Sequence, residues 1–213
     1  MDEPVRVKIC GVRTPLDLEA CVAARVDYVG LNLFPPSPRY VAPDALRALA
    51  AAAPPGLCKV ALVVDPDAAA LEALAALPVD MVQLHGREDP ARVAAIRARL
   101  GLPVMKTVAV AGPQDVAAIA AFEAVADQIL VEGRPPEGAD LPGGVGAGFD
   151  WRLVAGRRWA RPWMLAGGLK PDNVTEAVAV SGARQVDVAS GVERARGVKD
   201  AALIAAFAAA ARR

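Results

Sequence analysis

The stretch Val7-Lys8-Ile9-Cys10-Gly11, near the start of the chain, is the starting point for predicting the fold. Its pattern predicts a short buried strand that ends in a thiol, followed by a glycine that permits a tight turn. Seven further apolar runs of strand length follow, each paired with a helical stretch. If the ends of these strands converge, Cys10 lies at the rim of a barrel and faces a phosphate site on the last two strands.

The eight strand candidates are apolar runs bounded by turn residues, namely residues 5–9, 27–34, 58–64, 80–84, 104–110, 127–131, 163–166 and 185–189. Helix signals lie between them, such as Thr14 before Pro15 and Asp89 before Pro90. We expect a short helix over residues 149–156, a helix with Pro171 near its start, and a last helix from Asp200. Strands that alternate with helices indicate a parallel sheet of the α/β class.

Eight such units within 213 residues fit a closed (βα)8 TIM barrel better than an open doubly wound sheet, although periodicity alone does not choose between them. We predict a single domain over residues 1–213. The 24 basic residues balance the 24 acidic ones, which gives no reason to expect a nucleic-acid or membrane partner. The acidic start lacks the layout of a signal peptide, and the three cysteines have no metal-type spacing. We therefore expect a reduced, cytoplasmic protein.

Two glycine-containing turns predict a phosphate site. Gly167-Gly168 and Ser190-Gly191 each follow a strand candidate, one repeat unit apart. Backbone N–H groups at such turns can approach a phosphate closely, and barrels of this class commonly hold phosphate after strands seven and eight. The alternative is that the glycines only make tight turns. The run over residues 143–148 fits neither standard nucleotide-binding spacing, and we interpret it as a mobile loop near the site.

Cys10 and Glu132 are the candidates for proton transfer. Cys10 ends the first strand, and neighbouring cations can lower the pKa of a thiol enough to make it a base. Lys8 lies two residues earlier, on the same side of the strand, and can supply some of that effect. Glu132 follows the sixth strand. The alternatives are that Cys10 is a small buried hydrophobic residue and that Glu132 is a solvated loop carboxylate.

Three further polar residues are placed to bind a substrate. Arg39 follows the stiff segment Pro35-Pro36-Ser37-Pro38 and can bind a carboxylate through two hydrogen bonds. His85, the only histidine, ends the fourth strand, where it either lines a pocket or has a structural role. Asp187 is a strand carboxylate near the phosphate end, and its alternative role is an internal salt bridge, for example with Lys106.

Taken together, the motifs resemble those of the phosphoribosylanthranilate isomerase family of tryptophan biosynthesis. The motifs that carry the resemblance stand in order: residues 7–11, Ser37-Pro38-Arg39-Tyr40-Val41, Val82-Gln83-Leu84-His85-Gly86, Phe149-Asp150-Trp151, Leu165-Ala166-Gly167-Gly168-Leu169 with Asn173-Val174, and residues 186–193. The resemblance extends from about Val7 to Phe207.

The resemblance implies a cofactor-free and metal-free Amadori rearrangement of N-(5-phosphoribosyl)anthranilate inside a (βα)8 barrel. By motif match Cys10 is the general base and Arg39 holds the anthranilate carboxylate, while the turns at residues 167–168 and 190–191 hold the phosphate. Lys8, Gln83, His85 and Asp187 are expected to bind the substrate. We expect a phosphosugar substrate and a monomer or homodimer.

The chain departs from the family pattern at three places. The family usually carries aspartate as the general acid at the tip of strand six, where the simplest alignment of this chain places Glu132. Gly144-Val145-Gly146 stands where the family commonly has threonine or asparagine in the middle, and Ala189 replaces a frequent serine. Two alternatives follow: a catalytically weak paralogue that only binds phosphosugars, or a barrel isomerase for a related aminoaldose phosphate.

Overall fold

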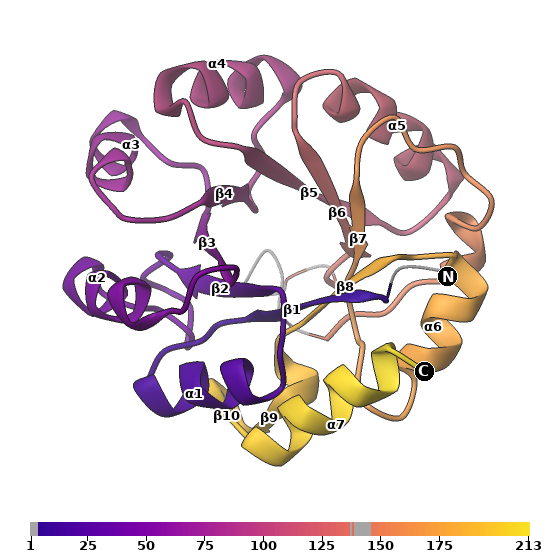
Figure 1. Ribbon diagram of the computed structural model, residues 1–213. Helices are drawn as coiled ribbons and strands as arrows, with labels where there is room; N and C mark the ends of the chain where they lie inside the picture. Colours follow the sequence, from indigo (N-terminus) through magenta and orange to yellow (C-terminus); the bar gives the residue numbers. More distant parts are fainter. Residues whose placement is uncertain (1–3, 137, 139–145) are drawn as a thin grey trace.

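The computed structural model describes residues 4–136, 138 and 146–213, and its strands close into a barrel (Figure 1). Eight parallel strands follow one another around the ring in chain order, and the first pairs with the last. They are β1 (Arg6–Cys10), β2 (Tyr28–Asn32), β3 (Cys58–Val63), β4 (Met81–Leu84), β5 (Val104–Val110), β6 (Gln128–Gly133), β7 (Trp163–Leu165) and β8 (Gln185–Val188). The predicted TIM barrel is therefore confirmed.

Helices surround the ring of strands (Figure 1). They are α1 (Pro15–Ala23), α2 (Pro43–Ala52), α3 (Ala68–Ala75), α4 (Pro90–Leu100), α5 (Pro113–Glu123), α6 (Val174–Ser181) and α7 (Ala201–Ala211). Local sequence explains their ends: Thr14 caps α1 with Pro15 in the first turn, and Gly101 ends α4 with a left-handed φ of 63°. In the described part of the chain, none of the helices is both long and apolar enough to cross a bilayer.

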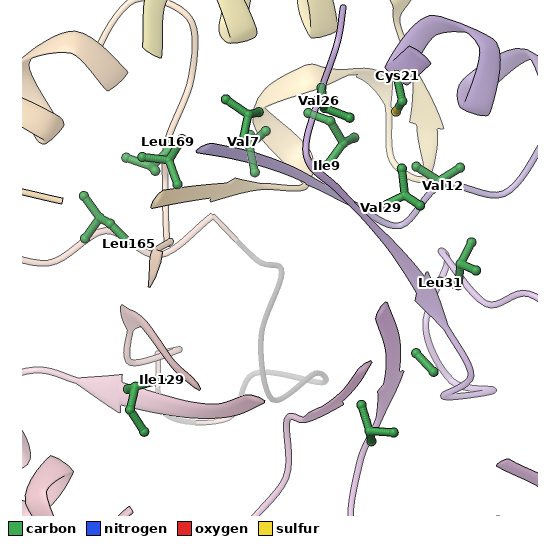
Figure 2. Packing of buried hydrophobic residues seen from close by; sticks show 14 of the residues in the cluster. Val7, Ile9, Val12, Cys21, Val26, Val29, Leu31, Ile129, Leu165 and Leu169 are labelled. Carbon is green, nitrogen blue, oxygen red and sulfur yellow. The ribbon is translucent and has the colours of Figure 1, made fainter. Parts of the chain in front are cut away.

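Alternation along the strands separates two packing regions. Residues such as Val7, Ile9 and Val29 point outward and pack between the strands and the helices, as Figure 2 shows. Their neighbours point inward. There a smaller apolar cluster fills the barrel interior: Tyr28, Val60, Met105, Leu130, Met164 and Ala166. Because the strands are parallel, their carboxyl ends meet on one face, and the inward residues near those ends become neighbours.

Three local features differ from the sequence prediction. The helix expected over residues 149–156 is only a 3₁₀ turn, η1 (Trp151–Leu153), because Asp150 caps it and Gly156 adopts a left-handed φ of 66° soon after. Helix α6 begins at Val174, after Pro171, because the Asn173 side chain bonds Lys170 N and Gly168 O and holds a turn there. A small hairpin after β8, made of β9 (Glu193–Ala195) and β10 (Val198–Lys199), was not predicted.

Candidate active site

A pocket opens at the carboxyl ends of the strands and contains about 740 Å³ of empty space, including open solvent at its mouth. Several predicted site residues line it together: Cys10, Arg39, His85, Glu132, Gly167 and Ser190. They come from segments spread over almost the whole chain, and closure of the barrel brings them to one cavity.

Cys10 and Lys8 lie on the same inward side of β1, as their spacing predicts. Lys8 is fully buried and Cys10 is 7% exposed at the pocket. Opposite them on β2 is Gly30, where an added Cβ would come within 2.9 Å of the Cys10 Sγ and 3.2 Å of the Lys8 Nζ. The absence of a side chain at position 30 therefore leaves the space that the thiol and the ammonium occupy.

Burial raises the pKa of the Cys10 thiol, and the nearby Asp187 carboxylate raises it further. The Lys8 ammonium acts in the expected opposite direction but does not outweigh burial. The neighbouring cations therefore lower this pKa, as expected, but burial leaves it above its ordinary value. For Lys8 itself, burial lowers the pKa, but Asp187 and Cys10 together raise it above its ordinary value. The ammonium beside the thiol stays charged, and the thiol is mostly protonated near neutral pH.

Lys8, rather than Lys106, is the ion-pair partner of Asp187. Lys8 Nζ donates to Asp187 Oδ1 (2.8 Å) and also to Gln83 Oε1 (2.9 Å). Lys106 instead donates to Glu88 Oε2 (2.6 Å) and to the carbonyl of Gly86 (2.7 Å). The suggested Asp187–Lys106 pair is therefore wrong. The Lys106–Glu88 pair is buried and holds the loop directly after His85.

Glu132 lies next to His85 at the carboxyl end of β6. Its Oε1 is 2.7 Å from His85 Nε2. The two atoms are buried and do not meet the angular requirements of a hydrogen bond in this arrangement. On the other side of the imidazole, Gln83 Nε2 lies 3.1 Å from Nδ1. Glu132 lines the pocket together with Cys10, so an acid and a thiol face one cavity from β6 and β1.

Arg39 is held by a carboxylate of the protein itself, which the sequence did not reveal. Its Nε donates to Glu193 Oε1 (2.7 Å) and its Nη2 to Glu193 Oε2 (3.0 Å). Lys199 donates to the same carboxylate (2.9 Å) and to the carbonyl of Ala189 (2.8 Å). Burial alone raises the pKa of Glu193, but the Arg39 and Lys199 cations outweigh it and lower that pKa to about 2. Glu193 is the last residue of the last motif, but no local signal in the sequence links it to Arg39.

The two glycine turns lie beside each other at the pocket. Gly167 has a φ of 84°, and an added Cβ there would come within 2.6 Å of the carbonyl oxygen of Ala147. A Cβ on Gly191 would collide with the carbonyl of Leu169. Both positions therefore require glycine, so the turns are also structurally necessary. Gly168 and Ser190 line the same pocket, where their backbone N–H groups and the Ser190 hydroxyl are the candidate phosphate ligands.

The glycine-rich run over residues 143–148 can be compared with the structure only in part. Residues 143–145, including the Gly144-Val145 departure from the family pattern, lie outside the described residues. Gly146 and Ala147 line the pocket.

Comparison with known proteins agrees with this geometry. The family model of N-(5'-phosphoribosyl)anthranilate (PRA) isomerase matches residues 7–210. An N-(5'-phosphoribosyl)anthranilate isomerase of Cereibacter sphaeroides is 57% identical over 209 residues, which cover 98% of this chain and 99% of the relative. The relative of that name from Paracoccus denitrificans is 54% identical, with 95% of each chain covered.

Solved structures agree as well. The phosphoribosyl anthranilate isomerase of Thermotoga maritima matches with a TM-score of 0.87 and 33% identity, covering 97% of this chain and 98% of its own. A phosphoribosyl anthranilate isomerase in complex with reduced 1-(o-carboxyphenylamino)-1-deoxyribulose 5-phosphate matches with a TM-score of 0.83 and 32% identity, covering 97% and 98%. The resemblance identified in the sequence is confirmed, and this chain belongs to the N-(5'-phosphoribosyl)anthranilate isomerase family.

Proposed function

We propose that this protein converts N-(5-phosphoribosyl)anthranilate to 1-(2-carboxyphenylamino)-1-deoxyribulose 5-phosphate, the isomerisation step of L-tryptophan biosynthesis. The observation that carries the proposal is the placement of Cys10 and Glu132 in one pocket, with Arg39 and the two glycine turns around them. This arrangement offers two proton-transfer groups and separate sites for the two anionic ends of one substrate.

Glu132 is the proposed general acid. Its proton goes to the ribose ring oxygen, the bond between that oxygen and C1 breaks, and the nitrogen lone pair forms a protonated Schiff base at C1. Cys10, as the thiolate, then removes the proton from C2, and those electrons form the enolamine. Transfer of the hydroxyl proton from C2 and protonation of C1 give the ketone. Every step is a proton transfer with bond reorganisation, so the proposed reaction uses neither metal nor organic cofactor.

The binding roles follow from charge. Arg39 is proposed to hold the anthranilate carboxylate, with its guanidinium oriented by Glu193. The turns at Gly167-Gly168 and Ser190-Gly191 are proposed to hold the phosphate, with backbone N–H groups and one hydroxyl as donors. Asp187, which lines the pocket and pairs with Lys8, is proposed to contact the bound substrate.

The partners and the location form part of the same proposal. One crystal structure of the Thermotoga maritima relative is described as that of monomers generated from a dimeric enzyme. For this chain we propose a monomer or homodimer without a nucleic-acid or membrane partner, in keeping with its net charge of zero. A cytoplasmic location agrees with Cys10, Cys21 and Cys58, which are all free thiols.

The test is a fluorescence assay that follows loss of the anthranilate-ribose substrate. We expect wild-type turnover and a decrease of about 10²- to 10⁴-fold in kcat for Cys10→Ala and for Glu132→Gln, because each removes one proton-transfer group. Matched controls are Cys58→Ala, at the start of β3 and outside the pocket lining, and Glu176→Gln, on the exposed side of α6. Both are expected to remain within about twofold of wild type.

The same assay separates the alternatives. Binding of a reduced product analogue without wild-type turnover would favour a phosphosugar-binding paralogue. Turnover of another aminoaldose phosphate in place of the anthranilate substrate would favour a related isomerase. Full activity in Glu132→Gln would remove Glu132 from the acid role. If Glu132→Gln instead loses activity, Glu132→Asp measures whether the shorter carboxylate reaches the ribose ring oxygen.

A further inference from the structure

A line of side chains crosses the barrel interior from β8 to β6, and three of them, Asp187, His85 and Glu132, line the pocket. It begins at Asp187, which accepts from Lys8 Nζ (2.8 Å). Lys8 also donates to Gln83 Oε1 (2.9 Å), and Gln83 Nε2 lies 3.1 Å from His85 Nδ1. His85 Nε2 in turn lies 2.7 Å from Glu132 Oε1. These contacts link the ammonium below Cys10 to the proposed acid across the pocket.

The direction of every hydrogen bond in this line is fixed by Lys8. An ammonium group only donates, so Gln83 must turn its carbonyl oxygen toward Lys8. The amide nitrogen of Gln83 then faces His85, and an NH₂ group also only donates. It contributes one hydrogen toward His85 Nδ1 and one to Thr107 Oγ1 (3.0 Å), which uses both. His85 Nδ1 accepts from this NH₂ group, and it also lies 3.4 Å from Thr107 Oγ1, whose own hydroxyl hydrogen can point to it. The proton of the neutral imidazole then resides on Nε2.

The contact on the far side of the ring agrees with this tautomer. Within the described residues, His85 Nε2 and Glu132 Oε1 are both buried without a hydrogen-bond partner, and they lie 2.7 Å from each other. Two bare acceptor atoms at that distance would repel each other, so a hydrogen must lie between them. The tautomer imposed from the Lys8 side supplies it as the Nε2–H of His85.

We propose that Gln83 and His85 are positioning residues for Glu132. Lys8 fixes the orientation of the Gln83 amide, and the amide fixes the tautomer of His85. Oε1 of Glu132 then accepts from the Nε2–H of His85, and the acidic proton resides on Oε2. This assignment replaces the substrate-binding role that the sequence suggested for Gln83 and His85. Its catalytic consequence rests on the proposed function, whereas the tautomer of His85 does not. When the Oε2 proton goes to the ring oxygen, the electron pair stays on the carboxylate. The hydrogen bond from His85 Nε2–H to Glu132 Oε1 then strengthens as the negative charge of the carboxylate develops.

The tautomer can be read directly because His85 is the only histidine of the chain. Untagged protein grown with ¹⁵N-labelled histidine gives the signals of one imidazole. We expect a protonated Nε2 and a bare Nδ1 in the wild type. In Gln83→Glu the carboxylate cannot donate, and we expect a protonated Nδ1. Gln128→Glu is the matched control, because it makes the same change at the opposite end of the barrel interior, beside Gln185, and should leave the imidazole spectrum unchanged.

A protonated Nδ1 with a bare Nε2 in the wild type would overturn the inference. So would a His85 spectrum that stays the same in Gln83→Glu. Neither measurement needs turnover. If the wild type shows the expected tautomer but does not isomerise the anthranilate substrate, only the proposed function fails.

Kinetics test the catalytic consequence. We expect Gln83→Glu and His85→Leu to lower kcat by about 10- to 100-fold while KM stays within about threefold, because the lost N–H stabilises the acid after proton transfer rather than the bound substrate. His85→Gln keeps an N–H at a similar reach and should recover part of the loss. A rise in KM at unchanged kcat would return both residues to substrate binding, and equal losses in His85→Gln and His85→Leu would indicate a merely structural role.

Discussion

At the residue scale, the chemical state of Cys10 is set by competition between burial and charge. Burial favours the neutral thiol, while the Lys8 ammonium favours the thiolate. Because the two groups lie on one side of β1 and Gly30 leaves them room, the ammonium acts at short range. The thiolate that the proposed mechanism needs is therefore a minor form near neutral pH, and its population depends on Lys8.

Lys8→Met is expected to slow alkylation of Cys10 by tenfold or more at pH 8, because each unit of rise in the Cys10 pKa lowers the thiolate fraction tenfold. The measurement is peptide mapping after brief treatment with iodoacetamide. Cys21 serves as an internal reference, since burial raises its pKa to about 12. Lys59→Met, a half-buried lysine paired with Asp80, is the control and should not change Cys10. Equal alkylation of Cys10 in Lys8→Met and wild type would contradict this account.

At the element scale, the β9–β10 hairpin connects two parts of the pocket. Glu193 accepts two hydrogen bonds from Arg39 and one from Lys199, and Lys199 also binds the carbonyl of Ala189, next to the phosphate turn. The hairpin thus fixes the guanidinium that is proposed to hold the substrate carboxylate and the turn that is proposed to hold the phosphate. We therefore expect a change in Glu193 to alter both stability and substrate binding.

The pKa of Glu193 predicts how stability depends on pH. It is about 2 in the folded protein against an ordinary value of 4.5. Between these values the unfolded chain takes up a proton that the folded protein does not, so stability falls as pH decreases from about 4.5 to about 2. The full contribution, about 3 kcal/mol, is present above pH 4.5, since each pKa unit corresponds to about 1.4 kcal/mol.

Urea unfolding at a series of pH values measures this contribution as the difference between wild type and Glu193→Gln. The difference should be largest above pH 5 and shrink toward pH 2. Glu176→Gln, an exposed carboxylate on α6, should follow the wild type throughout. A difference that is constant from pH 7 to pH 2 would mean that the charge of Glu193 contributes nothing.

At the scale of the whole molecule, Arg212, directly after α7, forms hydrogen bonds with the segment between α1 and β2. The Arg212 guanidinium donates to the carbonyls of Ala24 (3.2 Å) and Arg25 (2.6 Å) and to Asp27 Oδ2 (3.1 Å). Asp27 also accepts from the backbone N–H of Val7 (2.7 Å) in β1. These bonds join the end of α7 to the base of β1 and β2, close to where β1 pairs with β8 and the ring closes.

Arg212→Ala is expected to lower the free energy of unfolding by about 1–3 kcal/mol, because the loss leaves several acceptors without their donor. Urea unfolding followed by circular dichroism measures it. The neighbouring Arg213→Ala is the matched control, since the Arg213 side chain is exposed, and should change stability by less than about 0.5 kcal/mol. If both variants were equally stable, the C-terminal guanidinium would have no role in closing the barrel.

The sequence by itself determined the elements and their order. Apolar runs bounded by turn residues located all eight strands, and caps such as Thr14 and Gly101 located helix ends, because these signals act within a few residues. The same signals placed Cys10, Glu132 and the glycine turns at strand ends, and parallel strands bring such ends to one face.

Only the tertiary structure decided which polar groups meet. Lys8 and Asp187 are 179 residues apart, and Arg39 and Glu193 are 154 apart. Lys8 and Lys106 are both buried strand lysines, so sequence pattern alone could not assign Asp187 to one of them. Closure of the ring determines the partner of Asp187, because β1 pairs with β8 and places Lys8 opposite Asp187. Lys106, on β5, pairs with Glu88 instead. Partner choice across a barrel depends on strand register, and a register between distant segments has no local signal in the chain.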